Sequence, residues 1–388
     1  MAGGEDGKTK LIALIRNRID KDTFEGKYQA SVRKKILFIL ALLIIVVAMI
    51  FIGVGLGAVN IPFIDILKVF GHGIMPGTVG PPSKEYYSDF ILRGRLPRML
   101  LVVLTGFSLG VAGMIMQGLL RNPLVSPFTL GVSTAASFGA AVAIVIGASL
   151  FGGAMNAAVL LGSLRFNVDD LVKIVFAFGF AMISVGIILL LSRGKHVSRS
   201  MVILAGVVIS YLFQAGLMAT KYISDDQQLR DITLWTMGNM SGATWASVIV
   251  LLPIVAVCSV YLFRMSMDIN ALAAGDDVAT SLGVNVHSLR KRGLVICTLI
   301  ASACLAFTGV IGFIGLMAPH ICRMIIGNDS RYLLPAAGLM GVVILAISDL
   351  FCRLVIRPGE LPIGIVLYLV GGIFFIWMIS NKKWSQRV

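Results

Sequence analysis

The sequence has few charged residues for its length. Only 13% of its 388 residues are Asp, Glu, Lys or Arg, whereas 57% are hydrophobic. Soluble domains carry about 25% charged residues, so this chain lacks the polar surface that soluble domains of its size need. The composition therefore excludes an ordinary soluble protein and indicates a protein of the lipid bilayer.

Cysteine and histidine are also scarce, and neither is spaced as in a metal site. The five cysteines lie in apolar runs without a CxxC pair, which is typical of small buried hydrophobic residues. The four histidines form no HExxH motif, and no G-x-S-x-G nucleophile elbow is present. We therefore expect no catalytic residue, no metal site and no cofactor in this chain.

Carboxylates are almost absent from the apolar segments. Asp349 is the main exception, and Arg353 follows it at i+4, where the two side chains can pair on one helix face. Ion-driven carriers usually place carboxylates inside the membrane. If the chain transports a solute, we therefore expect a separate nucleotide-binding subunit to supply the energy.

Long apolar runs are abundant. A helix needs about 20 apolar residues to cross a hydrocarbon core of ~30 Å, and about ten stretches meet this requirement. They predict an all-α polytopic membrane protein, with a basic tail over 1–35 and a transmembrane domain over 36–388. Whether 293–310 and 311–327 form two short helices or one bent element stays open. The other expected spans are 36–57, 97–118, 131–151, 171–192, 201–222, 243–263, 333–355 and 361–380.

The basic residues are distributed unevenly between the two sides of these spans. If the N-terminus is cytoplasmic, the cytoplasmic segments hold 22 of the 33 Lys and Arg residues and a net charge of +13, against +1 outside. This bias predicts that both termini are cytoplasmic in a multi-pass plasma or inner membrane protein. It also accounts for the total of +14 without a nucleic-acid partner.

Small residues recur at the spacing that lets transmembrane helices approach closely. Gly53 and Gly57 form one small-xxx-small pair, and Gly106 and Gly110 form another. Such pairs allow close backbone contact in lipid, where no hydrophobic effect drives helix association. They predict tight helix packing and indicate no particular function.

The segment "RGRLPRML" places two arginines at the expected outer mouth of the second span. Arg95 and Arg98 lie three residues apart, with Pro97 near a helix start, so both guanidiniums project from one end. They are either interfacial arginines that reach lipid headgroups or a docking point for an acidic partner outside the cell. Arg353 is expected on the same side of the membrane.

The segment "RNPLVSP" interrupts the apolar pattern at the cytoplasmic end of the same span. Pro123 and Pro127 prevent a continuous helix, and non-helical backbone at membrane depth must be buried in protein or line water. The segment is either a turn exposed to the cytosol or a constriction in which Asn122 and Leu124 narrow a water-filled path.

A longer polar segment, 266–292, lies on the cytoplasmic side. It predicts two short helices around Gly275, one including Ile269–Ala274 and the other Asp277–Leu282, with Asp276 near the second N-cap. This is more than a hairpin connection needs. It is either a surface elaboration or a docking element for a cytoplasmic protein.

Six blocks, in order, resemble the FecCD family of ABC-importer permeases, the type II importers for iron-siderophores, haem and cobalamin. They cover Arg95 to Trp377 and together make a specific match. The chain departs from the family mainly in its long basic N-terminus and in "LGSLRFNVDD", to which we assign no role. The matching blocks are "RLPRMLLVVLTGFSLGVAGMIMQGLLRNPLVSPFTLGVSTAASFGA", "LAGVVIS", "LWTMGNMSGATW", "GDDVATSLGV", "GVIGFIGLMAPHICR" and "ELPIGIVLYLVGGIFFIW".

The resemblance implies a non-enzymatic translocation subunit that dimerises with an identical or paralogous copy. Two cytoplasmic ATPase subunits would bind ATP and Mg²⁺, and an extracytoplasmic binding protein would deliver the substrate. The residues it implies are Arg95, Arg98 and Arg353 for docking the binding protein; Asn122, Leu124, Ser198 and Ser200 for a cytoplasmic gate; and, within coupling helices over 266–286, Gly275, Asp276, Asp277, Leu282 and Gly283 for contact with the ATPase.

The substrate is less defined by the sequence. An iron-siderophore is expected because it is the commonest cargo of the family, and cobalamin and haem remain alternatives. Molybdate-type oxyanions are a further alternative. From another functional class, an ion-coupled secondary carrier that acts alone also stays open.

Overall fold

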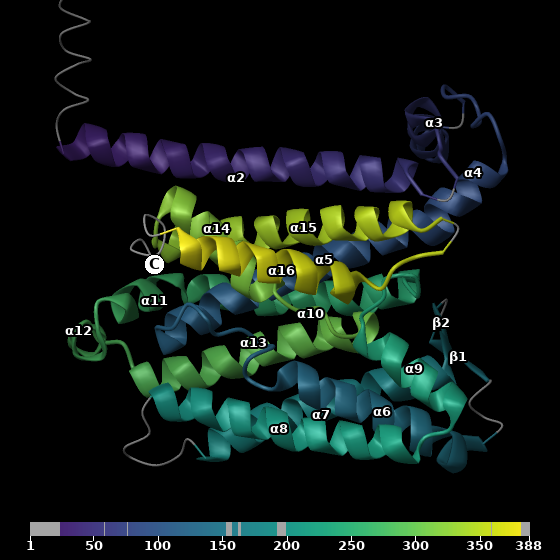
Figure 1. Cartoon of the computed structure of the whole chain (residues 1–388). Helices are drawn as coiled ribbons and strands as arrows, with labels where there is room; N and C mark the ends of the chain where they lie inside the picture. Colours follow the sequence, from purple (N-terminus) through teal and green to yellow (C-terminus); the bar gives the residue numbers. More distant parts are fainter. Residues whose placement is uncertain are drawn as a thin grey trace, which may run out of the picture.

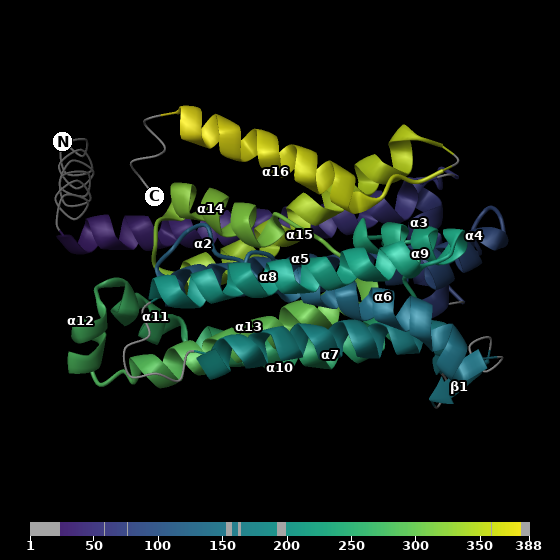
Figure 2. The same cartoon turned by 60° about the horizontal axis from the view of Figure 1, so that its bottom comes forward.

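The computed structural model describes residues 24–57, 59–75, 77–152, 157–161, 164–191, 199–357 and 359–381. In these residues the long helices lie side by side, α2 forms one edge of the bundle, and α16 runs along another (Figures 1 and 2). The helices are α2 Phe24–Gly55, α3 Phe63–Ile74, α4 Tyr86–Asp89, the π-helix η1 Phe90–Arg95, α5 Leu96–Leu120, α6 Val132–Phe151, α7 Val168–Leu191, α8 Arg199–Ile223, α9 Asp226–Thr236, α10 Trp245–Arg264, α11 Ser266–Ala273, α12 Asp276–Ser281, α13 Val286–Thr308, α14 Ile314–Ile326, α15 Ser330–Val355 and α16 Ile363–Ser380.

The apolar helices occur where the sequence predicts spans. Eight helices in the described residues are long and apolar enough to cross a bilayer, while α6, over Val132–Gly147, and α14 are shorter apolar helices. Helix α2 begins at Phe24, so ordered helix already starts within the segment predicted as a basic tail. The fold is all-α except for one antiparallel hairpin, β1 Ala158–Leu161 and β2 Leu164–Asn167.

Two opposite ends of the bundle are important for the sites below. Helices α3 and α4 and the hairpin lie at one end of the bundle (Figure 1). Arg95 is the last residue of η1, which directly follows α4, so we call this the Arg95 end. Helices α11 and α12 lie at the other, the α12 end, where α2 also begins and α16 ends (Figure 1). The segment that contains "LGSLRFNVDD" thus supplies β2 and the start of α7 at the Arg95 end.

Helix α5 lies in the core and packs closely on α15. A Cβ atom at Gly106 would lie 2.7 Å from the Gly341 carbonyl oxygen, and one at Gly110 would lie 2.2 Å from that of Ala337. Backbone therefore approaches backbone at both glycines, and the predicted packing role of this pair is confirmed. Gly53 likewise faces the Met99 side chain, and Gly57 faces Arg95.

The second predicted span begins earlier than expected. A continuous helix runs from Tyr86 to Leu120, and Pro97 lies near the start of its α-helical part rather than at a free helix end. Proline has no N–H and its ring clashes with the carbonyl four residues earlier. The π-helical turn of η1, directly before Pro97, accommodates this missing bond.

The break between the seventh and eighth spans falls at residues 309–313. Gly309 and Phe313 both have positive φ, 68° and 63°, which helical backbone does not allow, so α13 and α14 are two helices and not one bent element. The Thr308 carbonyl at the end of α13 finds a partner elsewhere in the chain, because Asn239 N–H donates to it at 2.8 Å. Non-helical backbone at this depth is thus hydrogen-bonded within the protein.

Candidate functional site

The three arginines predicted to dock a binding protein lie together at the Arg95 end. Arg98 is held between two carboxylates: its Nη2 lies 2.8 Å from Asp349 Oδ1, and its Nη1 lies 2.9 and 2.8 Å from the two oxygens of Glu360. Arg353 Nη2 lies 2.9 Å from Asp349 Oδ2. The predicted i,i+4 pair is therefore present, and Arg98 joins it from another helix.

Arg95 and Arg353 also bind the C-terminal end of α2. Arg95 Nη1 donates to the carbonyls of Val54 and Gly55 at 2.8 and 2.9 Å, and Arg353 Nη1 donates to that of Gly53 at 2.9 Å. The last carbonyls of a helix have no partner within it, and cations are favoured there. These two guanidiniums thus fasten α2 to η1 and α15.

These contacts limit what the arginines can offer to a partner. The side chain of Arg353 is 5% exposed and that of Arg98 is 12% exposed, whereas Arg93 nearby is 84% exposed. Glu360 is exposed and occupies one edge of the Arg98 guanidinium. The docking role of Arg95, Arg98 and Arg353 stays a prediction.

Sequence reasoning missed Glu360 as a partner of Arg98. Glu360 stands in the quoted block "ELPIG", but it lies 262 positions from Arg98 on the connection between α15 and α16. Helical spacing reveals pairs within one helix, such as Asp349 and Arg353, and says nothing of pairs that the fold brings together. The available signal was the position of Glu360, two residues before Pro362 at the start of α16.

The predicted gate turn follows α5 at the α12 end. Arg121 has left-handed backbone with φ of 46°, and Asn122 Oδ1 accepts a hydrogen bond from Leu124 N–H at 2.9 Å. This Asx turn reverses the chain, and Leu124 is exposed. Ser200 lies exposed in the first turn of α8, and Ser198 lies outside the described residues. The gate assignment stays a prediction.

The predicted coupling segment forms two short helices, α11 and α12. Gly275, with φ of 132°, separates them and is the N-cap of α12, and Asp276 follows it as the first residue of the helix, near the cap as predicted. Asp276 binds Arg290 through both carboxylate oxygens, at 2.9 and 2.8 Å. Gly283, with φ of 85°, ends α12, and Asp277 and Leu282 are exposed. Contact with an ATPase stays a prediction.

Asp329 connects three elements at the α12 end. Its carboxylate accepts hydrogen bonds from Asn270 of α11 at 3.0 Å and from Arg331 at 2.7 Å, and it lies 3.6 Å from Lys35 of α2. The hydrogen bonds from Arg331 and Asn270 lower the pKa of Asp329 below its usual value. Asn270 Oδ1 also accepts from Ser330 N–H at 2.8 Å, so α11, α15 and α2 are fastened to one another.

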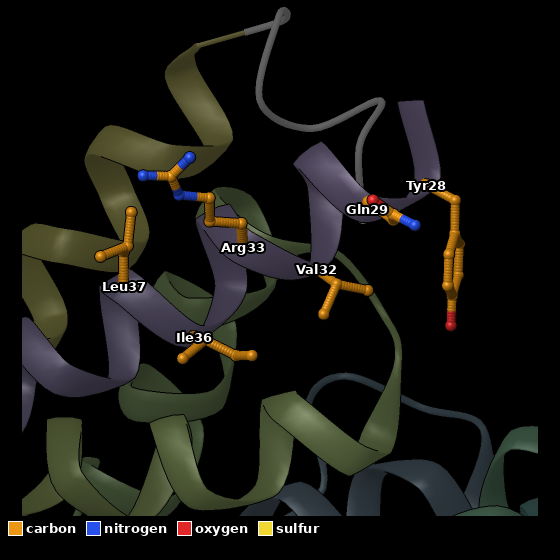
Figure 3. A pocket seen from close by; sticks show the side chains of 6 residues that line it. All are labelled: Tyr28, Gln29, Val32, Arg33, Ile36 and Leu37. Carbon is orange, nitrogen blue, oxygen red and sulfur yellow. The ribbon is translucent and has the colours of Figure 1, made fainter. Parts of the chain in front are cut away.

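A hollow of about 290 Å³ lies on the first turns of α2 (Figure 3). Arg33 and Leu37 project on one side of the helix, and Val32 and Ile36 project on another. All six lining residues come from α2. In the part of the chain that the structure describes, this is a hollow on one helix surface and not a cleft between elements.

The family of this chain follows from its similarity to known proteins. The profile of the FecCD transport family matches residues 42–381. The chain belongs to the FecCD transport family. The chain is 37% identical to the hemin transport system permease protein HmuU of Yersinia pestis over 76% of this chain and 83% of that protein. It is 33% identical to the vitamin B12 import system permease protein BtuC of Vibrio vulnificus over 74% of this chain and 82% of that protein.

A solved structure extends the likeness to the fold. A protein described as a candidate metal-chelate type ABC transporter in an inward-facing conformation matches this FecCD-family chain with a TM-score of 0.71 and 26% identity. The match covers 87% of this chain and 96% of the other. The predicted all-α permease fold is therefore confirmed, and the chain is a multi-pass membrane protein.

Proposed function

We propose that this chain is the membrane permease subunit of an ABC importer that moves a metal chelate into the cell. The family match over residues 42–381 carries the proposal, because it spans nearly all the apolar helices. The chain itself supplies a path and no chemistry, and a separate ATPase subunit would use ATP and Mg²⁺. The proposed complex contains two permease copies, identical or paralogous, and two ATPase subunits.

The two ends of the bundle receive different partners in this proposal. The α12 end faces the cytoplasm and presents Asp277 and Leu282 to the ATPase, and the Arg95 end faces outward to the binding protein. The charge bias of the loops supports this orientation. The fastening of α11 to α15 and α2 through Asp329 lets a push on the coupling segment move whole helices.

Docking at the Arg95 end requires an exchange of partners in this proposal. Arg98 already binds two carboxylates, those of Asp349 and Glu360, and Glu360 is the exposed one. A carboxylate of the binding protein can take the place of Glu360 without exposing the buried pair of Asp349 and Arg353. Arginine forks bind carboxylates in this two-oxygen geometry.

A metal chelate is the proposed substrate class. The relatives are named as transporting hemin and vitamin B12, and the similar structure is described as of the metal-chelate type. In such cargo the chelator already fills the coordination sphere of the metal, so the permease needs no metal ligand. A ferric siderophore is the first cargo to test, followed by haem and cobalamin.

Reconstitution in liposomes tests the proposed function. The permease is combined with the ATPase and binding protein of its own organism, and uptake of the three labelled chelates is measured. The proposal predicts uptake of one chelate that needs ATP and both partners. Uptake by the permease alone, driven by a proton or sodium gradient, would identify an ion-coupled carrier and refute the proposal.

A further inference from the structure

A cavity of about 220 Å³ lies at the α12 end beside the turn that follows α5. Its walls come from the end of α5, the turn at Asn122, helix α11, the end of α14 and the start of α15. Helix α11 contributes Ile269 and Ala273. The cavity therefore borders the segment that we propose contacts the ATPase, although it is separate from the exposed residues of α12.

Two guanidiniums line this cavity, those of Arg121 and Arg323, and its lining includes no carboxylate. Arg323 Nη2 donates to Gln117 Oε1 at 3.1 Å, and Gln117 Nε2 donates in turn to the Gly315 carbonyl at 3.1 Å. Within the described ranges, no carboxylate oxygen lies within 4 Å of either arginine. The nearby carboxylate of Asp329 is already bound by Asn270, Arg331 and Lys35.

The two arginines that line the cavity have no carboxylate counter-charge in its lining. Arg323 is partly buried, has five N–H donors and makes one described hydrogen bond to another side chain. A buried charge is costly unless a counter-charge and hydrogen bonds accompany it. The C-terminal ends of α5 and α14 attract both cations by their helix dipoles, but each such contact contributes only about 0.3–1 kcal/mol and supplies no full counter-charge.

We propose that the cavity binds a carboxylate side chain of the ATPase subunit, in addition to the contact made by α12. This inference rests on the proposed function. A carboxylate matches the donor geometry of a guanidinium, and a cavity of about 220 Å³ is several times the ~30 Å³ that one water occupies in the liquid. Inorganic phosphate and a lipid headgroup share the oxyanion chemistry, but the wall formed by α11 places the cavity on the ATPase side of the chain.

The affinity of the purified ATPase subunit for the permease in nanodiscs tests the inference. Arg121→Gln removes the cation at an exposed position of the cavity, and Arg323→Gln removes the partly buried one. Arg264→Gln is the matched control, because Arg264 is an exposed arginine at the same end of the bundle that does not line the cavity. We expect about tenfold weaker binding for each cavity variant, the size of a 1.4 kcal/mol loss, and less than a twofold change for the control.

Additional measurements distinguish the possible occupants of the cavity. Phosphate added in place of chloride at equal ionic strength should weaken binding to the wild type and not to Arg121→Gln. Equal ATPase affinity of Arg121→Gln and Arg264→Gln would overturn the inference, as would a loss of co-purified anionic lipid in Arg121→Gln with unchanged ATPase affinity. Arg121→Gln decides the question even if Arg323→Gln does not fold. Failure of the wild type to bind an ATPase would instead refute the proposed function.

Discussion

Replacement of Gly110 by alanine tests the close approach of α5 and α15. The added Cβ would lie 2.2 Å from the Ala337 carbonyl oxygen, whereas ordinary Cβ contacts begin at 3.4 Å. The two helices would have to separate by about 1 Å, because the obstacle is backbone and not a side chain that can rotate. Such overpacking typically costs ~1–3 kcal/mol, against ~0.5–1 kcal/mol gained from removing a helical glycine.

Unfolding by SDS titration in mixed micelles, followed by tryptophan fluorescence, measures this effect. We expect Gly110→Ala to lower the free energy of unfolding by about 1–2 kcal/mol. Gly179→Ala on α7 is the control, because no atom lies within 4 Å of its added Cβ, and it should be neutral or slightly stabilising. Equal stability of the two variants would refute the close backbone contact.

Two further predictions concern the carboxylates at the ends of the bundle. Glu360→Gln should free one edge of the Arg98 guanidinium and strengthen binding of the binding protein about three- to tenfold, measured by surface plasmon resonance; unchanged or weaker binding would contradict the proposed exchange. Asp329→Asn should lower the free energy of unfolding at pH 7 by about 1–3 kcal/mol, because it removes the negative charge that pairs with Arg331 and Lys35 and one of the two acceptor oxygens, although the remaining amide oxygen can still accept from Asn270. The pKa of Asp329 is lowered in the folded state, so its contribution is complete above the unfolded value near ~4 and is lost as the pH falls further. Thermal melts from pH 7 to 3 should therefore fall more steeply for the wild type than for Asp329→Asn, and parallel curves would contradict this assignment.

The apolar helices and the contacts within them could be predicted from the sequence. The length of the apolar runs predicted the spans, and the i,i+4 spacing predicted the contact between Asp349 and Arg353. The small-residue spacing of Gly106 and Gly110 also indicated a close helix contact, which α15 provides. These features depend on residues near one another along one helix, so a local pattern is sufficient.

The contacts between distant segments could not be predicted in this way. Glu360 reaches Arg98, and Asn270 reaches Asp329, only because loops and helices from separate parts of the chain meet. The π-helical turn before Pro97 extends a span that hydropathy alone started later. The assignments to docking, gating and coupling stay predictions, and the sequence did not show which of these groups already bind other residues of the chain, as Arg98 binds Asp349 and Glu360.

The proposed importer needs the Arg95 end and the α12 end on opposite sides of the membrane. The five native cysteines are buried, so single cysteines can be introduced at exposed positions and labelled in intact cells. A membrane-impermeant maleimide should label Arg93→Cys and should label Leu282→Cys only after the cells are permeabilised. Labelling of both positions in intact cells would contradict the assignment of one end to the binding protein and the other to the ATPase.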